Sequence, residues 1–487
     1  MRIPLHPNEK KLRIRDLTGG VNLSVSPDEL ADDEISVGVN WEYDVLSTLP
    51  KVRPGLGATE WCDTGLDEVE SLFYCPNRDF FLCSDGTTLK KAVDGSPGAV
   101  GTLAGSKIPV YHLWGETNDV LIASGGKLQH YDGTTLTKYD GTGELDTSPD
   151  CDIVYVQFGR VLLAKAGSDR IHYSGVGDCG NWTGGGDDDY QYQDVGYKDG
   201  RDIRAMVMLS NDLIVFKAIG GDNTQGIIYR ILYGFPDWEQ REISRDIHTF
   251  SQLTVLPLGD DVFYLDKRGL KNLSTVAEYG DVKTTDQGDK VVSEISDGNV
   301  SQARLWHIPQ KGQVWVKPAN GGPIWVYSYT HGAWTCFTFP STVEPLSIAT
   351  DGTYVYAGCN DGKIYKMDPD SSFDGGIAVT ATLKYKRIAS NTQLVITEFG
   401  MRYKGFTTGS GNLQIGNDAI ALSFDPEGDV AYDDEDVAYD DADYPVAEVE
   451  GRRIKRTNLR GFEFTPELVV SEGKIELKEL WIHYAEV

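Results

Sequence analysis

Apolar and polar positions along the middle of the chain repeat a short unit many times. Each unit has a polar turn, four or five apolar or alternating residues, a second turn with Gly or Asp, and usually a second strand-like run, as in NRDFFLCSDGTTLKK (77–91). Equivalent positions fall near residues 79, 119, 160, 212, 261, 313 and 353, so the units are 40 to 52 residues apart. Such runs predict short β-strands joined by turns.

This spacing is the one expected for the blades of a β-propeller. One blade cannot bury both faces of its sheet, whereas blades arranged radially cover one another and leave only short edges. We therefore expect an irregular six- or seven-bladed β-propeller over residues 59–374. The repeated Asp-Gly-Thr turns at Asp85, Asp132 and Asp351 fit connections between strands and indicate no further function.

The pattern changes at both ends of the chain. Residues 1–58 are expected to form an arm, a short helix and a first strand, because Ser26, Pro27 and Glu29 have the spacing of a helix start. After residue 375, runs such as AVTATLKYKRI alternate like half-buried antiparallel strands. Residues 375–487 are therefore expected to form a β-sandwich-like domain, and the fold class is all-β.

Composition agrees with many short strands and excludes several other classes. The 487 residues include 54 Gly, 25 Tyr and 10 Trp, and no apolar run reaches the length of a membrane span. The first residues lack the apolar core of a secretion signal, so we expect synthesis in the cytoplasm. Seven cysteines without a C-x-x-C pair predict neither zinc binding nor a disulfide framework.

The formal net charge is −29, yet two short segments are basic. Residues 1–15 carry five cations against one acid, a net charge of +4, and a second basic run, GRRIKRTNLR, follows an acidic stretch of twelve acids in 425–450. Either segment could dock on an acidic surface, although a frayed terminus and a solvated acidic loop are the alternatives. The candidate interaction residues are Arg2, Lys10, Lys11, Arg13, Arg15, Arg452, Arg453 and Arg456.

No motif for catalysis, metal binding or phosphate binding stands out. DPDSSFDGG offers Asp368 and Asp370 at the spacing of a calcium loop, but Val379 occupies the position where a bidentate Glu is needed. The acidic segment 184–194 could bind a cation weakly, but it is expected to be a polar loop. His112, His130 and His172 stand beside strand positions, where a hydrogen-bonded role is expected. We therefore predict no catalytic residue, no metal and no cofactor, while a carboxylate pair for glycoside cleavage stays open.

The N-terminal segment GGVNLSVSPDELADDEISVGVNWEYDVLSTLPKVRPG (19–55) resembles the signature of bacteriophage tail nozzle proteins, also called DNA-stabilisation or tail tubular proteins. The tandem AYDDEDVAYDDADY resembles a Trp-Asp repeat of such proteins, with Tyr432 and Tyr439 in place of Trp, and GKIELKELWIHY resembles their last strand. The matching N-terminal positions are Gly19, Gly20, Asn22, Asp32, Asp33, Glu34, Asn40, Arg53, Pro54 and Gly55.

The resemblance implies a structural virion protein of short-tailed phages, made in the host cytoplasm and located in the tail. It implies a homo-hexameric ring below the head–tail connector, or adaptor, that conducts and retains DNA and anchors fibres or spikes. With a charge of −29 per subunit, we expect DNA to pass through without tight binding. The alternatives are a carbohydrate-binding or carbohydrate-cleaving propeller and a soluble protein-interaction propeller.

Overall fold

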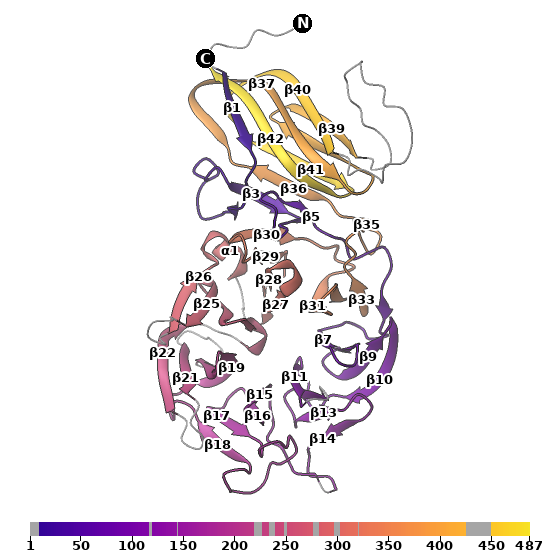
Figure 1. The fold of residues 1–487 in the computed structure, drawn as a ribbon, viewed down its shortest axis with the longest axis vertical. Coiled ribbons are helices and arrows are strands. Elements are labelled where there is room, and N and C mark those ends of the chain that lie inside the picture. The colour runs from indigo at the N-terminus through magenta and orange to yellow at the C-terminus, as the bar shows by residue number, and fades with distance from the viewer. Residues whose placement is uncertain are drawn as a thin grey trace.

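The computed structural model describes residues 9–115, 119–143, 145–218, 226–232, 239–247, 251–275, 282–296, 302–319, 321–424 and 450–487. Two parts are visible in Figure 1, a ring of small sheets below and a sandwich of longer strands above. In the blades whose first and fourth strands are both labelled in Figure 1, the first strand lies nearer the centre of the ring and the fourth strand lies farther out. No helix among the described residues is long and apolar enough to cross a membrane.

The first five blades are four-stranded antiparallel sheets in which strands pair in chain order. Blades one to three contain β7 (Ser71–Cys75), β8 (Phe80–Ser84), β9 (Thr88–Val93) and β10 (Ser96–Thr102); β11 (Val110–Trp114), β12 (Asp119–Ala123), β13 (Gln129–Tyr131) and β14 (Leu136–Lys138); and β15 (Ile153–Gln157), β16 (Arg160–Ala164), β17 (Arg170–Tyr173) and β18 (Gln191–Asp194). Blades four and five contain β19 (Asp202–Leu209), β20 (Asp212–Ala218), β21 (Gly226–Leu232) and β22 (Glu239–Ile247); and β23 (Val255–Leu258), β24 (Asp261–Asp266), β25 (Gly269–Thr275) and β26 (Val282–Asp286).

The last two blades use strands from elsewhere in the chain. Blade six contains β27 (Arg304–Ile308), β28 (Gln313–Lys317), β29 (Ile324–Ser328) and β30 (Ala333–Phe337), and blade seven contains β31 (Pro345–Thr350), β32 (Val355–Cys359) and β33 (Lys363–Lys366). The fourth strand of blade seven is β6 (Cys62–Asp63), which comes from before the first blade and pairs with β33. The ring therefore closes through pairing between its two chain ends.

Each neighbouring pair of blades shares a cluster of buried apolar side chains, including the pair of blades seven and one. The interface of blades seven and one, for example, contains Tyr356 and Ile364 from one blade and Phe81 and Cys83 from the other. Burial of both faces of every sheet is what the sequence repeat predicted. The propeller is confirmed, with seven blades.

The repeat anchors and the Asp-Gly-Thr turns have the structural roles that the sequence suggested. The seven anchor positions lie at or within two residues of the start of the second strand in each blade. In each turn an Asp carboxylate oxygen accepts backbone hydrogen bonds, as Asp132 Oδ1 does from Thr134 N (2.7 Å) and Thr135 N (2.6 Å). The following Gly133 has φ 93°, a left-handed conformation that favours glycine. These backbone hydrogen bonds lower the pKa of Asp132.

The upper part is a sandwich of two sheets built from both ends of the chain. One sheet has the order β4–β5–β42–β37–β40. Strand β1 also pairs with β42, farther along the edge that β5 occupies. The second sheet contains β3, β36, β41, β38 and β39. Their strands are β1 (Glu9–Ile14), β2 (Gly20–Val21), β3 (Glu34–Val39), β4 (Trp41–Glu42), β5 (Lys51–Val52), β36 (Ala381–Tyr385), β37 (Ile388–Gly405), β38 (Gly409–Ile415), β39 (Asp418–Phe424), β40 (Glu450–Phe464), β41 (Pro466–Glu472) and β42 (Ile475–Glu486).

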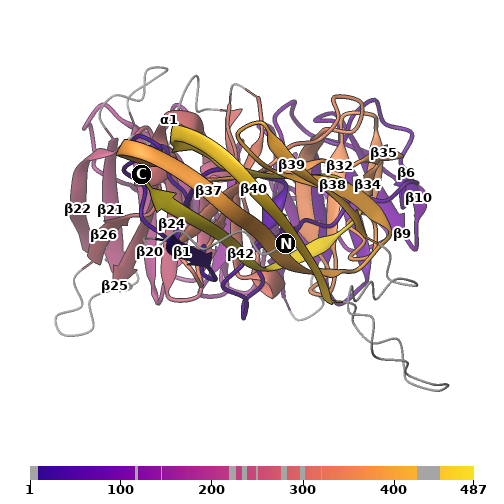
Figure 2. The same cartoon turned by 90° about the horizontal axis from the view of Figure 1, so that it is seen from above.

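The sandwich and the propeller are joined through a shared sheet and a shared core. Strand β3 pairs with β36 of the sandwich and, at Val39, with Cys336 of blade six, so ten strands form one continuous sheet. A single cluster of buried side chains runs from Phe263 in blade five through Trp334 to Phe399 in the sandwich. Figure 2, seen from above, shows the long strands β37, β40 and β42 crossing over the ring.

The few remaining elements are short, and one expected helix is not formed. They are η1 (Gln252–Thr254), η2 (Asp289–Val291), α1 (Val292–Ile295), η4 (Pro309–Lys311), and the strands β34 (Phe373–Asp374) and β35 (Ile377–Ala378). The helix expected from Ser26 onward is wrong: residues 27–29 form a turn, with Glu29 N bonded to Ser26 O. Ser26 Oγ donates to the Asp28 and Glu29 carboxylates instead of capping a helix. The AYDDEDVAYDDADY tandem lies outside the described residues.

Candidate docking surface

The first basic segment is part of a strand. Strand β1 pairs with β42 from Glu9–Ala485 to Ile14–Leu480, which places Lys10, Lys11 and Arg13 in the strand and Arg15 directly after it. Arg2 lies outside the described residues. Side chains alternate: Leu12 and Ile14 face the core of the sandwich, while Lys11 and Arg13 lie on the opposite face.

The second basic segment forms part of β40. Arg452 and Arg456 are exposed and lie four positions apart, so their side chains point to the same face of the strand. Arg453 directly follows Arg452, so its side chain points to the other face, where it pairs in register with buried Met401. Its proximity to the Tyr403 hydroxyl opposes the rise that burial causes in the pKa of Tyr403. The structure therefore separates Arg453 from the other candidate residues.

Strand pairing brings the two basic segments onto one surface. The order β1–β42–β37–β40 aligns Lys11 with His483, Glu398 and Arg456 in one cross-strand row. The next row on this face contains Arg13, Trp481 and Gly400, and the row after it contains Glu479, Arg402 and Arg452, next to Arg15. We call this surface the basic sheet face and define it by the cations Lys11, Arg13, Arg15, Arg402, Arg452 and Arg456.

The acids on the basic sheet face lie deeper than its cations. Glu479 is 7% exposed, and its Oε1 lies 3.0 Å from Arg15 Nε and 3.6 Å from Arg13 Nε. Glu398 Oε2 lies 3.8 Å from Arg456 Nε. With Glu9, which accepts from Thr397, there are three acids for six cations, a formal net charge of 6 − 3 = +3. A positive surface on a chain of charge −29 is electrostatically complementary to an acidic surface.

Trp481 lies at the centre of the basic sheet face. Its ring covers Gly400, since a Cβ on Gly400 would meet Trp481 Cζ2 at 2.6 Å and Arg453 O at 2.3 Å. The indole Nε1 donates to Glu398 Oε1 (3.3 Å), and the Arg452 guanidinium lies 5.3 Å from the ring centroid. The ring holds Glu398 and Arg452 in fixed positions on the surface.

His483 adds a titratable group to the same surface. It lies 3.9 Å from the carboxylates of Glu9 and Glu398. Burial lowers its pKa, and the nearby Lys11 and Arg13 lower it further, while the two carboxylates oppose this change. His483 is therefore neutral near pH 7 and does not add to the positive charge of the face.

An apolar hairpin tip borders the basic sheet face near Arg15. The loop between β4 and β5 carries Leu46, which is 95% exposed, and Val45, which is 42% exposed. A groove of about 410 Å³ lies beside it, lined by Arg15, Asp44, Leu46, Ser47, Thr48, Leu49, Glu476, Leu477 and Lys478. A fully exposed leucine beside a positive surface gives a partner both an apolar and a charged contact.

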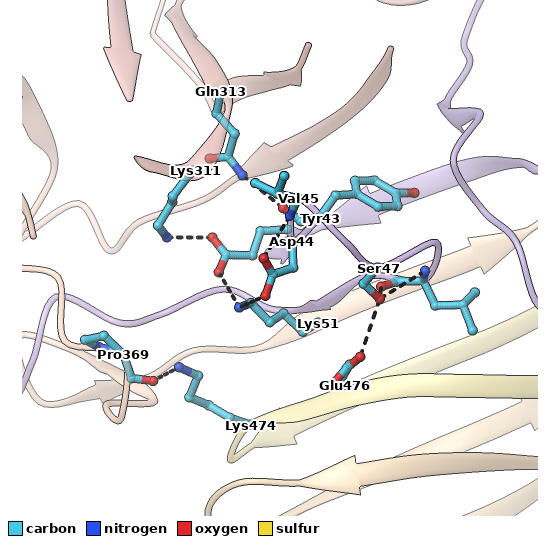
Figure 3. Close-up of polar contacts among 12 residues, drawn as sticks. Tyr43, Asp44, Val45, Ser47, Lys51, Lys311, Gln313, Pro369, Lys474 and Glu476 are labelled. Atoms are coloured by element: carbon cyan, nitrogen blue, oxygen red, sulfur yellow. Dashed lines mark hydrogen bonds and ion pairs between the residues drawn. The ribbon is translucent and has the colours of Figure 1, made fainter. Parts of the chain in front are cut away.

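Hydrogen bonds and ion pairs fix the base of this hairpin, as Figure 3 shows. Buried Glu42 accepts from Lys311 (2.7 Å) and lies 3.7 Å from Lys51, which also contacts Asp44 (3.2 Å). Ser47 Oγ donates to Leu49 O (2.8 Å) and lies 3.4 Å from Glu476 Oε1. Lys474 donates to Pro369 O from the other side of the junction. The tip is thus presented on a rigid base.

The segment with the nozzle-like signature lies at the junction of propeller and sandwich. Asn40 has φ 60°, and its side chain accepts from Arg53 Nε (2.8 Å) and Thr338 N (2.9 Å) and donates to Thr380 O (2.8 Å). Arg53 is fully buried and forms an ion pair with Asp374. Gly55 is required because a Cβ would lie 2.3 Å from Phe373 O.

Other positions of this segment also make internal contacts. Asn22 Nδ2 donates to Glu34 Oε1 (2.9 Å), and Glu34 lies 3.0 Å from Lys290 Nζ. A Cβ on Gly20 would lie 2.5 Å from Trp334 N, so the chain approaches blade six closely there. The polar groups of this segment therefore serve packing between the two parts, and the candidate interaction residues lie elsewhere.

The remaining candidates from the sequence have local roles. His172 Nδ1 bonds to Tyr190 OH (2.8 Å), and His130 Nε2 lies 3.1 Å from Asp119 Oδ2. Asp368 Oδ1 accepts from Asp370 N within a turn. Within the described ranges, no group of three or more His, Cys, Asp or Glu side chains is placed to hold a metal ion.

The sequence did not identify several residues of the basic sheet face. Arg402, Glu398, Trp481 and Glu479 come from β37 and β42, whose separate sequences show no basic cluster. Their signal was the period-two alternation of exposed and buried positions, which becomes informative only when the strand order is known.

No family model and no curated protein matches the chain. Among solved structures, virginiamycin B lyase from Staphylococcus aureus aligns with 63% of this chain and 97% of its own, at 12% identity and a TM-score of 0.44. The extracellular domain of a one component system from B. thetaiotaomicron aligns with 81% of this chain and 58% of its own, at 12% identity and a TM-score of 0.45. YCF48 from Cyanidioschyzon merolae aligns with 64% of this chain and 100% of its own, at 11% identity and a TM-score of 0.40.

Proposed function

We propose that the protein is a non-catalytic structural subunit that docks on an acidic partner through the basic sheet face. The observation that carries this proposal is the convergence of two basic segments, separated by more than 430 residues in sequence, on one exposed surface with a net charge of +3. Neighbouring Leu46 supplies an apolar anchor. Such a combination favours specific protein docking over general attraction of counter-ions.

The sequence resemblance suggests which assembly this is. We propose a nozzle of a short-tailed phage, in which copies form a ring below the head–tail connector and DNA passes through the ring. A ring requires contacts between different surfaces of neighbouring subunits. Six subunits would carry 6 × −29 = −174 formal charges, which disfavours tight binding of the DNA that passes.

The proposal is tested with the purified full chain and the head–tail connector of the phage that encodes it. Mass photometry should show a ring of defined stoichiometry on the connector. The variant Arg402→Glu/Arg456→Glu should lose most of this binding, because it turns the net charge of the face from +3 to −1. The matched control Arg241→Glu/Arg268→Glu reverses two exposed arginines of the propeller and should bind normally.

Equal assembly of both double variants would refute docking through the basic sheet face. Random occupancy of the connector by independent monomers would refute the ring. Duplex DNA provides a third measurement, at about 150 mM salt, where charge interactions reach roughly 8 Å. We expect no mobility shift. Sub-micromolar DNA binding that Arg402→Glu/Arg456→Glu abolishes would instead assign this face to nucleic acid.

A carbohydrate-binding propeller is the second candidate, and blade three favours it. Tyr192 is 52% exposed and Tyr197 is 65% exposed, beside the polar side chains of β18. The Arg170 guanidinium lies 3.8 Å from the Tyr192 ring centroid and fixes the ring in place. Exposed aromatic rings can stack on sugars. Glycan-array binding that Tyr192→Ala removes would support this candidate, whereas binding to no glycan would end it.

A further inference from the structure

A cavity at the centre of the propeller contains an arginine with two available nitrogen atoms. The cavity has a volume of about 240 Å³ and lies where the first strands of five blades approach one another. Its lining includes Glu70, Tyr111, Leu253, Arg304 and Ile348, one residue from each of these blades or the turn before it. A site built by five blades has a fixed shape, because each blade is packed against its neighbours.

Arg304 is only partly satisfied by the protein. Its Nη1 donates to Glu70 O (2.6 Å) and to Leu346 O. Within the described part of the chain, Nε and Nη2 have no acceptor, no carboxylate lies within 4 Å, and neither atom is sealed from solvent. Nε and Nη2 form the edge of a guanidinium that binds a carboxylate through two parallel hydrogen bonds.

Glu70 provides the opposite charge in the same cavity. Its carboxylate has no hydrogen bond or ion pair with any residue that the structure describes, and it lies beside the turn at Gly86. Burial raises the pKa of Glu70, against the effect of Arg304, and burial lowers the pKa of Arg304. The Glu70 carboxylate and the Nε–Nη2 edge of Arg304 thus lose hydration without a protein partner among the described residues, and a ligand of complementary charge would restore what they lose.

The rest of the cavity is mostly apolar, and its polar side chains are a hydroxyl pair and Gln252 and Ser347, which bond to the backbone of Met206 and Val69. Leu72, Ile108, Val110, Leu253 and Ile348 contribute aliphatic side chains. The hydroxyls of Ser71 and Tyr111 lie 2.8 Å apart, so one of them keeps a proton to donate. We propose that this cavity binds a small zwitterion with an apolar side chain, of the α-amino-acid class. Its carboxylate contacts the Nε–Nη2 edge of Arg304, and its ammonium group faces Glu70.

The proposal is independent of docking through the basic sheet face, and its test uses the full chain with three probes of one shape. L-leucine has both charges, 4-methylpentanoate lacks the ammonium group, and isoamylamine lacks the carboxylate. Calorimetric titration should show saturable binding of L-leucine, at least tenfold weaker binding of 4-methylpentanoate, and no binding of isoamylamine. Absence of L-leucine binding to the folded protein at 10 mM would overturn the proposal.

Variants separate the two charged contacts from general damage to the cavity. Arg304→Lys keeps the positive charge but loses the guanidinium edge, and it should weaken L-leucine binding at least tenfold. Glu70→Gln should do the same and bring the affinity for L-leucine to the level of 4-methylpentanoate. Glu60→Gln, an acid of blade seven outside the cavity, is the matched control and should bind normally. Unchanged binding in both Arg304→Lys and Glu70→Gln, with circular dichroism showing folded protein, would overturn the assignment.

Discussion

The arginine at the junction and the arginines of the basic sheet face have opposite surroundings. At the junction, Arg53 is fully buried, and its guanidinium contacts Asn40, Pro54 O, Thr338 O and Asp374. On the basic sheet face, Arg13, Arg15 and Arg456 are 46%, 61% and 61% exposed in their side chains and share two acids with their neighbours. The junction satisfies its charge internally, whereas the sheet face keeps an excess.

This difference separates residues that hold the fold from residues that are available to a partner. A buried charge is tolerated only where every hydrogen bond is made, so the junction tolerates little change. An exposed ion pair contributes little to stability because water and salt screen it. Substitutions should therefore affect stability at the junction and binding at the sheet face.

The largest effect on the free energy of unfolding is expected from a substitution at the junction. Asp374→Ala leaves Arg53 buried without its carboxylate and removes the acceptor of Leu56 N (2.9 Å). Loss of one partner of a buried pair costs about 3–5 kcal/mol of unfolding free energy. Urea unfolding followed by tryptophan fluorescence measures this loss, with exposed Asp370→Ala as the control. A loss below about 1 kcal/mol, on the scale of an exposed pair, would remove the distinction between the two regions.

A smaller effect is expected where the sheet face itself is packed. Gly400→Ala places a Cβ against Trp481 and Arg453 O, and overpacking of this kind costs about 1–3 kcal/mol. Thermal unfolding measures the cost, and a change in tryptophan emission would report the displaced indole. Gly376→Ala, where the space around the missing Cβ is open but φ is 87°, is a control for backbone strain alone. Equal stability of wild type and Gly400→Ala would show that the ring can move away.

A pH-dependent effect is expected at Lys474, which is 6% exposed behind the hairpin. Burial lowers its pKa to about 8, with Lys311 and Lys51 acting in the same direction and Glu42 and Asp370 opposing them. Between about pH 8 and its usual value of 10.5, the unfolded chain binds more protons at this site, so Lys474 makes stability rise with pH.

Lys474→Met should remove that rise. The difference in unfolding free energy between wild type and Lys474→Met should change by about 1–2 kcal/mol between pH 7 and 10.5, in favour of wild type at high pH. The variant also lacks the hydrogen bond to Pro369 O at every pH, which lowers its stability by a constant and leaves the change with pH to Lys474 alone. Lys478→Met, at a more exposed ion pair with Glu476, is the control. Parallel pH profiles for wild type and Lys474→Met would contradict the lowered pKa.

The smallest effect on stability is expected from Arg402→Ala/Arg456→Ala. Removal of two exposed cations should change the unfolding free energy by less than about 1 kcal/mol. The same variant should elute later from an anion exchanger at pH 7, because the loss of two cations changes the net charge from −29 to −29 − 2 = −31. A large loss of stability with unchanged retention would mean that this face resembles the junction.

Much of the propeller could be predicted from the sequence. The seven anchors, from NRDFFLCSDG onward, each lie at or within two residues of the start of the second strand of a blade, because alternation and turn residues act over a few neighbouring positions. The Asp85, Asp132 and Asp351 turns were predicted for the same reason. The turn at residues 27–29 was missed because Ser26 and Glu29 satisfy a helix-start pattern but Arg387 N bonds to Pro27 O, tying the segment to the sandwich.

The sequence by itself determined the repeat, the strands and the two basic segments, since these follow from local patterning and charge. Only the tertiary structure decided that Lys11 and Arg456 share a face while Arg453 does not, and that β6 closes the ring. It also decided that Arg53 pairs with Asp374 and that Arg304 and Glu70 line one cavity. These relations join residues tens to hundreds of positions apart. They depend on strand order and register, which result from packing of the whole chain and leave no mark at any one position.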